Sequence, residues 1–479
     1  MPPSFEKSDL FNPALQAISV GKMELQKSLF IFRRDLRLED NTALIAALSE
    51  SKEVACAFFF DPRQVNEDAN PYFSKNAFQF MLLSLGELAM EIEKKGGKLR
   101  LFLGKPEDII GKLDIDAVFV NRDYTPFSIK RDSELAKACK KGGIAFHSFG
   151  DALLCEPELV HKPDGKPYTV FSHYFRSASK FAVSKPTKNT HSNYFKGELK
   201  GSDERLLYKM RKKLGNKNTK IAGGRKRGLG ILERISDFRH YASLRNLPAK
   251  DGTTKLSAHH KFGTVSIRET YHAIASGLSE NHPLINEIYW RDFFTYIACH
   301  FPHVFGAPFN RKYENLRWKG NEARLLAWKE GKTGFPIVDA GMRELNATGF
   351  MHNRVRMIVA SFLTKDLHID WREGEMHFAR HLLDFDPCVN NGNWQWSAST
   401  GCDAQPYFRI FNPWLQQKRF DPDCEYIKKW VPELSALPPR AIHALEKGNP
   451  PKGYPSQIVV HGEEARLSKF IFSQASKGT

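Results

Sequence analysis

Cysteine and long apolar runs are both scarce in this sequence, and their scarcity excludes several classes of protein. None of the seven cysteines among the 479 residues belongs to a CxxC pair; they are Cys56, Cys139, Cys155, Cys299, Cys388, Cys402 and Cys424. An odd set of unpaired cysteines argues against a disulfide framework and a structural zinc site, so we predict no metal site and a reducing, cytoplasmic location. No stretch approaches the roughly 18 apolar residues that a membrane-spanning helix needs. We therefore expect no membrane partner.

Acidic residues are also few relative to basic ones. The chain has 71 Lys and Arg against 54 Asp and Glu, a net charge of +17. This excess favours a polyanionic partner, DNA or RNA first, although a basic solvent-exposed surface alone would produce the same balance. Residues 196–227 hold twelve Lys and Arg and three Asp and Glu, so they contribute +9 of the total. That stretch is either a solvated linker or an arm that approaches phosphates.

The hydrophobic pattern divides the chain into four parts. We expect a flexible tail over 1–27, an α/β domain over 28–150, a basic interdomain linker over 151–230 and a large all-helical domain over 231–479. In the α/β part, helical patterns alternate with short apolar runs, which predicts a parallel, Rossmann-like sheet covered on both faces. These runs lie at 29–32, 54–60, 99–103, 117–120 and 144–149. No GxGxxG sequence opens the first helix, so an ordinary dinucleotide site is not predicted there.

One segment of the helical part is dense in residues that can hold a ligand. Residues 380–414 read RHLLDFDPCVNNGNWQWSASTGCDAQPYFRIFNPW, which we interpret as a loop with paired carboxylates, amides and indoles. Residues two apart there address different sides, so each pair could serve different groups of one ligand. A buried turn with aromatic packing is equally compatible. The side chains concerned are Asp384, Asp386, Asn390, Asn391, Trp394 and Trp396.

Three further segments could contribute to the same site. In GFMHNRVRM (349–357), helical spacing places Asn353, Arg356 and Met357 on one face of a helix and Arg354 on another. Arg356 could form an ion pair with Asp384 or Asp386. DGTTKLSAHHKFG (251–263) has hydroxyls and exposed amides before a helix, which suit a phosphate but equally cap a helix. EIYWR (287–291) places a Glu and a Trp at helical spacing, either lining a pocket or as part of an amphipathic stripe.

Taken together, these segments resemble the photolyase/cryptochrome family, most closely its class I cyclobutane pyrimidine dimer photolyases. FIFRRDLRLEDNTAL (30–44) is similar to that family's first strand and loop. EGKTGFPIVDAGMRELNATGFMHNRVRM (330–357) and NNGNWQWSASTGCDAQPYFRIFNP (390–413) are similar to its flavin and substrate core. The resemblance covers residues 28–440. It implies an α/β domain, a helical FAD-binding domain, and light-driven repair of dimers in UV-damaged DNA by electron transfer from reduced FAD.

The resemblance also implies roles for individual residues. The flavin phosphates would lie at Tyr241, Thr253, Thr254, Lys255, Leu256 and Ser257. The flavin ring and ribityl chain would contact Asn353, Arg356, Asp384, Asp386 and Asn390, and Asn390 would tune the protonation of the flavin. The dimer and DNA would contact Arg245, Glu287, Trp290, Arg291, Asn353, Arg354, Met357 and Trp396. Electrons would reach FAD from the surface through Trp318, Trp371 and Trp394.

Departures from the family pattern narrow the function. Asn353 and Met357 stand where members that repair (6-4) photoproducts have two histidines, which argues against that activity. Residues 302–308 read PHVFGAP and lack the Cys-Lys pair of folate binders, so a deazaflavin or another flavin is the expected antenna chromophore, if one binds. We expect a monomer. A cryptochrome-type flavin photoreceptor and a basic nucleic-acid binder with an incidental flavin are the alternatives, and light-dependent repair would distinguish them.

Overall fold

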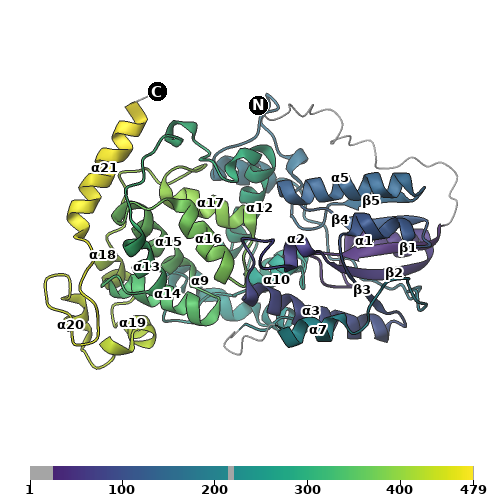
Figure 1. Ribbon diagram of the computed structural model, residues 1–479, viewed down its shortest axis with the longest axis horizontal. Helices are drawn as coiled ribbons and strands as arrows, with labels where there is room; N and C mark the ends of the chain where they lie inside the picture. Colours follow the sequence, from purple (N-terminus) through teal and green to yellow (C-terminus); the bar gives the residue numbers. More distant parts are fainter. Residues whose placement is uncertain (1–24, 214–220, 478–479) are drawn as a thin grey trace.

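Two domains lie side by side in the computed structural model, which describes residues 25–213 and 221–477 (Figure 1). An α/β domain occupies the right of Figure 1, and a larger helical domain occupies the left. The predicted combination of a parallel sheet and an all-helical region is therefore confirmed. Most of the expected tail, residues 1–24, lies outside the described residues, and residues 25–27 belong instead to the first strand.

The α/β domain contains a five-stranded parallel sheet with strand order β3-β2-β1-β4-β5. Its strands are β1 (Leu25–Phe32), β2 (Ser51–Phe60), β3 (Leu99–Leu103), β4 (Ala117–Asn121) and β5 (Ala145–Phe149). Its helices are α1 (Thr42–Glu50), α2 (Pro62–Val65), α3 (Lys75–Lys94), α4 (Pro106–Ile109) and α5 (Pro126–Lys141).

Both faces of this sheet are buried, as the continuous apolar runs predict. Successive side chains of a strand point to opposite faces. Phe30 and Phe32 pack with residues of α1 and α3, whereas Leu29 and Ile31 pack on the other face with residues of α5. The strand order reverses between β1 and β4, and the loops that follow these two strands line a small charged cavity. Such a reversal is where open α/β sheets usually bind ligands.

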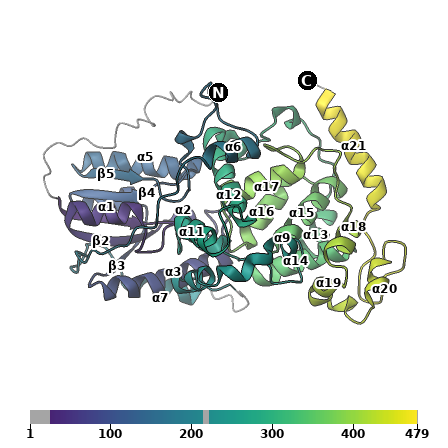
Figure 2. The ribbon, with the colours of Figure 1, turned by 180° about the vertical axis from the view of Figure 1, so that it is seen from behind.

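The segment predicted as a basic linker packs against both domains. It contains α6 (Phe171–Ala178), α7 (Leu206–Lys213) and α8 (Arg225–Leu232). The amide of Phe195 donates to the carbonyl of Val54 at 2.8 Å, beside β2, and α7 lies along α3 (Figures 1 and 2). Of the basic stretch 196–227, residues 214–220 lie outside the described part of the chain.

The helical domain is built from α9 to α21. Its helices are α9 (Tyr241–Leu244), α10 (Ser257–Phe262), α11 (Ile267–Gly277), α12 (Pro283–His300), α13 (Glu322–Glu330), α14 (Pro336–Thr348), α15 (Asn353–Ser361), α16 (Trp371–His381), α17 (Pro387–Ala398), α18 (Pro413–Phe420), α19 (Glu425–Trp430), α20 (Pro439–His443) and α21 (His461–Lys477). Its largest apolar cluster draws on α13 to α19. Within the described residues, no helix combines the length and the apolar character that crossing a bilayer requires.

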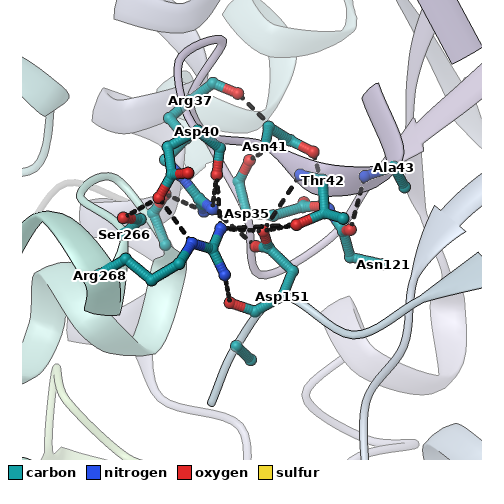
Figure 3. A network of polar contacts seen from close by, with 12 residues as sticks. Asp35, Arg37, Asp40, Asn41, Thr42, Ala43, Asn121, Asp151, Ser266 and Arg268 are labelled. Carbon is teal, nitrogen blue, oxygen red and sulfur yellow. Dashed lines mark hydrogen bonds and ion pairs between the residues drawn. The ribbon is translucent and has the colours of Figure 1, made fainter. Parts of the chain in front are cut away.

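A buried network of charges joins the two domains (Figure 3). Arg268, on α11, donates from Nε to Oδ2 of Asp40 at 2.9 Å and from Nη2 to Oδ1 of Asp151 at 2.8 Å. Arg37, in the loop after β1, donates from Nη2 to the other oxygen of Asp151 at 2.7 Å. All four side chains are buried, so each charge depends on its partners. This network fixes the β1 loop against the helical domain.

Candidate functional site

Asp384 is the point where three of the predicted site segments meet. Its Oδ2 accepts hydrogen bonds from Ser257 Oγ at 2.6 Å and from Arg356 Nη2 at 2.9 Å. Of the two carboxylates considered as partners for Arg356, the structure selects Asp384. The second oxygen, Oδ1, is buried and has no hydrogen-bond partner among the described residues. A buried acceptor without a donor carries a large desolvation penalty, so this oxygen fits an N–H group of a ligand.

The Asp/Asn/Trp segment is a helix rather than the predicted loop. Asp386 caps α17, because its Oδ1 accepts hydrogen bonds from the amides of Cys388 and Val389 at 3.0 and 3.1 Å. Pro387 suits the first helical position. The helix ends at Ser399, whose backbone is left-handed. Asx and Gly residues inside a helix are unfavourable alone, so the cap and the surrounding packing stabilise this one.

Asp386 is turned away from Asp384. Its Oδ2 pairs with Arg34, from the loop after β1, so both of its carboxylate oxygens are committed within the protein. Burial alone would raise the pKa of Asp386, but Arg34 and then Lys261 more than offset it and hold the pKa at about 2. This side chain therefore holds the start of α17, and its predicted contact with a ligand stays a prediction.

Asn390 lies one turn inside α17, beside α16. Its Nδ2 donates to the backbone carbonyl of Glu375 at 3.2 Å, while Asn391 Nδ2 donates to the carboxylate of Glu375 at 2.9 Å. Burial raises the pKa of Glu375 to about 7. The side-chain orientation of Asn390 is thus fixed by a neighbouring helix, which leaves its oxygen available to a ligand.

The predicted phosphate segment forms a polar turn before α10. Lys255 has a left-handed backbone with φ of 54°, and its Nζ donates to Asp251 at 2.5 Å. Leu256 is buried in a small apolar cluster, so only its backbone could meet a ligand. Thr253 and Thr254 remain half-buried. Ser257 joins this turn to Asp384, which places the turn at the same site.

Residues 245 and 246 connect two of the predicted DNA-contacting helices. Arg245 Nη1 donates to Glu287 Oε1, on α12, at 2.5 Å, and Arg354 Nη2, on α15, donates to Asn246 Oδ1 at 2.7 Å. Burial and the positive charges of Arg245 and Arg419 lower the pKa of Arg354. No carboxylate pairs with Arg354 among the described residues. The uncompensated positive charge suits an anionic group.

Two neighbouring residues of α12, Trp290 and Arg291, contact different parts of the chain. Trp290 is half-buried and stacks on Phe171 of α6, with ring centroids 3.7 Å apart and planes 9° from parallel. Arg291, expected at the DNA, instead donates from Nη1 to the carbonyl of Ala152 at 2.7 Å and lines the interdomain cavity. On a helix, adjacent residues point about 100° apart, so Arg291 faces Ala152 at the start of the linker while Trp290 faces α6, further along the linker.

The three tryptophans of the predicted electron path share one apolar cluster. Trp371 and Trp394 are buried in it, and Trp318 packs against it from the surface side. Trp394 also meets Trp328, whose ring centroid lies 6.1 Å away and which is fully buried. Trp328 was not predicted from the sequence, because a single Trp in a helical pattern is usually a packing residue of the core. Trp396 and Met357 are half-buried, and Asn353 is exposed at the start of α15.

Two family models match this chain, one in each domain. The model described as "DNA photolyase" matches residues 28–191, and the model described as "FAD binding domain of DNA photolyase" matches residues 284–473. The chain belongs to the DNA photolyase family. A relative named deoxyribodipyrimidine photo-lyase, from a Synechococcus species, is 36% identical over 473 residues, which cover 93% of this chain and 96% of the relative.

Solved structures of the family agree in fold. An archaeal photolyase from Sulfolobus tokodaii, described with two FAD molecules, is 44% identical, with a TM-score of 0.86 over 94% of this chain and 100% of that one. A cryptochrome from Synechocystis is 27% identical, with a TM-score of 0.85 over 93% of this chain and 99% of that one. The family thus spans repair enzymes and cryptochromes, as the sequence analysis expected.

Proposed function

We propose that this protein repairs cyclobutane pyrimidine dimers in DNA, using light and FAD. The observation that carries the proposal is the cluster of Asp384, Arg356 and Ser257 in a chain of this family. Its unpartnered buried oxygen and adjacent guanidinium fit the N–H and carbonyl groups along the edge of a flavin ring. Bound, reduced FAD would supply one electron to the dimer on illumination and recover it once the ring has split.

Other residues around this cluster would bind the rest of the cofactor and supply it with electrons. The turn 253–257 holds the cofactor's phosphates through hydroxyls and backbone amides. The amide of Asn390 is fixed by α16 and presents its oxygen to the ring. Trp394, Trp371 and Trp318 carry electrons inward through the apolar cluster, where the absence of water limits side reactions.

The proposed substrate surface draws on residues of α12, α15 and α17. A dimer inside a duplex must be flipped out before it can be reached, and the damaged pair is easier to unstack than an intact one. The indoles of Trp290 and Trp396 offer flat faces for the flipped bases. Burial raises the pKa of Glu287, and its ion pair with Arg245 opposes that shift. The carboxyl group of Glu287 can form a hydrogen bond with the edge of a base. Arg354 neutralises a phosphate.

We propose a flavin or deazaflavin rather than a folate as the antenna, because residues 302–308 lack the Cys-Lys pair of folate binders. The small charged cavity between the domains is the candidate place for its anionic group. This cavity lies where the loops after β1 and β4 diverge, and Nη2 of Arg33 is buried there without a hydrogen-bond partner among the described residues. An orphaned guanidinium nitrogen suits the phosphate or carboxylate of a second chromophore. Heating the protein would release its chromophores, which can then be identified and counted. We expect FAD plus a second chromophore for each chain, and FAD alone would contradict an antenna.

We further propose that the protein is a monomer and is located in the cytoplasm.

Substitution of Asp384 tests the flavin site directly. Asp384→Asn keeps the shape but removes the charge that pairs with Arg356, and loss of a charge-assisted hydrogen bond should weaken FAD binding about ten- to a hundredfold. The matched control is Asp423→Asn, at an exposed aspartate. FAD titration of each apoprotein, followed by flavin fluorescence, measures the affinity. Equal affinities in the two variants would contradict the assignment of Asp384.

A further inference from the structure

We propose that Phe171, on the linker helix α6, positions Trp290 to receive the damaged base. This inference rests on the proposed function, because it assigns Trp290 to lesion binding. Residues 151–230 were predicted from the sequence only as a basic interdomain linker. In the structure, α6 of this segment packs against α12 beside Trp290.

The stack of Phe171 on Trp290 covers one face of the indole. The two rings are nearly parallel, 9° apart, with centroids separated by 3.7 Å. Phe293 meets the same indole edge-on at 5.7 Å, and Phe294 lies tilted at 5.5 Å. Trp290 is nevertheless only half-buried. Phe171 covers one face of the indole and the other two phenylalanines contact it at an angle, so the plane of the indole is restricted. The proposal assigns the face opposite Phe171 to the base.

Phe171 is itself held by the segment that follows α17. Its backbone amide donates to Asp403 Oδ2 at 3.0 Å, and Cys402 Sγ donates to the carbonyl of Thr169 at 2.8 Å. The amide of Tyr168 donates to the hydroxyl of Tyr296, on α12, at 2.8 Å. The start of α6 is therefore fastened both to α12, which carries Trp290, and to the chain just after α17, which carries Trp396. Figure 2 shows α6 beside α12.

This placement has a consequence for specificity. A free indole on a helix samples several rotamers and would lose that freedom on stacking with a base. Phe171 restricts Trp290 before the DNA arrives, so less entropy is lost on binding. Contacts to phosphates do not depend on this orientation. Phe171 should therefore affect damaged DNA and leave undamaged DNA almost unaffected.

The experiment compares four single variants with the wild type. Phe171→Ala removes the stack, Phe171→Tyr keeps an aromatic ring, and Phe171→Leu keeps an apolar side chain without the ring. Phe175→Ala is the matched control, because Phe175 lies one turn further along α6 and contacts Phe171 and Tyr289 rather than Trp290. For each holoenzyme, competition binding at one salt concentration gives the ratio of affinities for dimer-containing and undamaged duplexes.

The expected changes in affinity follow from the free energy that one aromatic pair contributes. Phe171→Ala and Phe171→Leu should lower the affinity ratio by about two- to tenfold, while Phe171→Tyr and Phe175→Ala should leave it near the wild-type value. Combined with Trp290→Ala, Phe171→Ala should lower the ratio no further, because the two residues act through one contact.

Other outcomes overturn the proposal in recognisable ways. Equal losses on both duplexes would reduce Phe171 to a structural residue, and tighter binding of damaged DNA by Phe171→Ala would mean that Phe171 occupies the place of the base. If Trp290→Ala lowers the ratio and Phe171→Ala does not, only this inference fails. If Trp290→Ala leaves the ratio unchanged, the proposed lesion pocket itself is wrong.

Discussion

Trp394 is one of two residues of the proposed electron path that are buried in the core of the helical domain. Its ring packs edge-on against Phe378 at 4.9 Å, and a side chain at Gly374 would collide with it. This tight packing gives Trp394 one orientation, which suits a residue that must pass an electron across a fixed gap. Trp371 is buried in the same cluster, and Trp318 stands at its edge beside Phe472.

Replacing Trp394 with Phe should separate flavin photoreduction from repair. We expect Trp394→Phe to abolish light-driven reduction of oxidised FAD and to leave repair by chemically reduced enzyme largely intact, because the path only charges the cofactor. Trp430→Phe, on α19, serves as the control. Absorbance under illumination follows the first reaction, and repair of dimer-containing DNA follows the second. Normal photoreduction in Trp394→Phe would point to another donor, with Trp328 the first candidate.

For individual residues, the sequence predicted which side chains pair better than it predicted the direction in which a side chain points. The pairing of Arg356 with a carboxylate of the 384–386 pair followed from charge and helical spacing, and it is confirmed for Asp384. Arg291 donates to the carbonyl of Ala152, which is 139 residues away in the chain. Its predicted contact with DNA stays a prediction. Local periodicity carries no information about such distant partners.

The start of α17 is the element on which most of the site depends, and a residue of the other domain holds it. Arg34 donates from Nη1 to Asp123 at 3.1 Å and from Nε to the carbonyl of Lys261 at 3.1 Å, and it pairs with Asp386. One guanidinium thus ties the loops after β1 and β4 to α10 and α17. Because α17 carries Asn390, Trp394 and Trp396, the α/β domain takes part in positioning the flavin site.

Removing this guanidinium should destabilise the protein in a pH-dependent way. We expect Arg34→Gln to lower the free energy of unfolding by about 3 kcal/mol at neutral pH, since it breaks a largely buried ion pair. The pKa of Asp386 is about 2 in the folded protein, against roughly 3.9 when unfolded. The stability that this carboxylate contributes is therefore present above pH about 4 and lost as pH falls toward 2.

The difference between the wild type and Arg34→Gln should accordingly shrink over that acidic range. Arg33→Gln is the control, because Arg33 pairs with Asp132 inside the α/β domain at 2.8 Å. Urea unfolding at a series of pH values provides the free energies, and hydrogen exchange at Cys388 and Val389 reports on the helix start. Faster exchange there in Arg33→Gln but not in Arg34→Gln would contradict the account.

The types of the helices and strands and their order could largely be predicted from the sequence. The exception is α17, which was predicted as a loop. The five strands were predicted because both faces of the sheet are apolar. The helix at 387–398 was predicted as a loop because the segment is dense in Asp, Asn, Gly and Trp, which have low helix propensity. Tertiary packing on α16 and α12 overrides that propensity.

At the scale of the whole molecule, the buried charge network of Figure 3 holds the two domains in one arrangement. Arg268 pairs with both Asp40 and Asp151, and Arg37 shares Asp151. Burial alone would raise the pKa of Asp151, but the two arginines more than offset it and hold the pKa at about 2. A distance between an antenna and the flavin would be constant only if this interface is rigid.

Breaking the network should loosen the domains from each other. Arg268→Leu leaves two buried carboxylates short of a partner, and we expect it to lower the free energy of unfolding by about 3 to 5 kcal/mol. Lys250→Ala, which removes an exposed pair with Glu425, is the control and should have little effect. Differential scanning calorimetry measures both, and an unchanged midpoint for Arg268→Leu would show that the network does not hold the interface.

The central claim is light-driven repair, and one measurement tests it most directly. Purified protein with reduced FAD is mixed with a duplex that contains a single thymine dimer, then illuminated with blue light or kept dark, and intact thymines are quantified. The account predicts that dimers are converted to thymines in the light and that none are converted in the dark. Tight binding of the damaged duplex with no conversion in the light would contradict it and favour a photoreceptor.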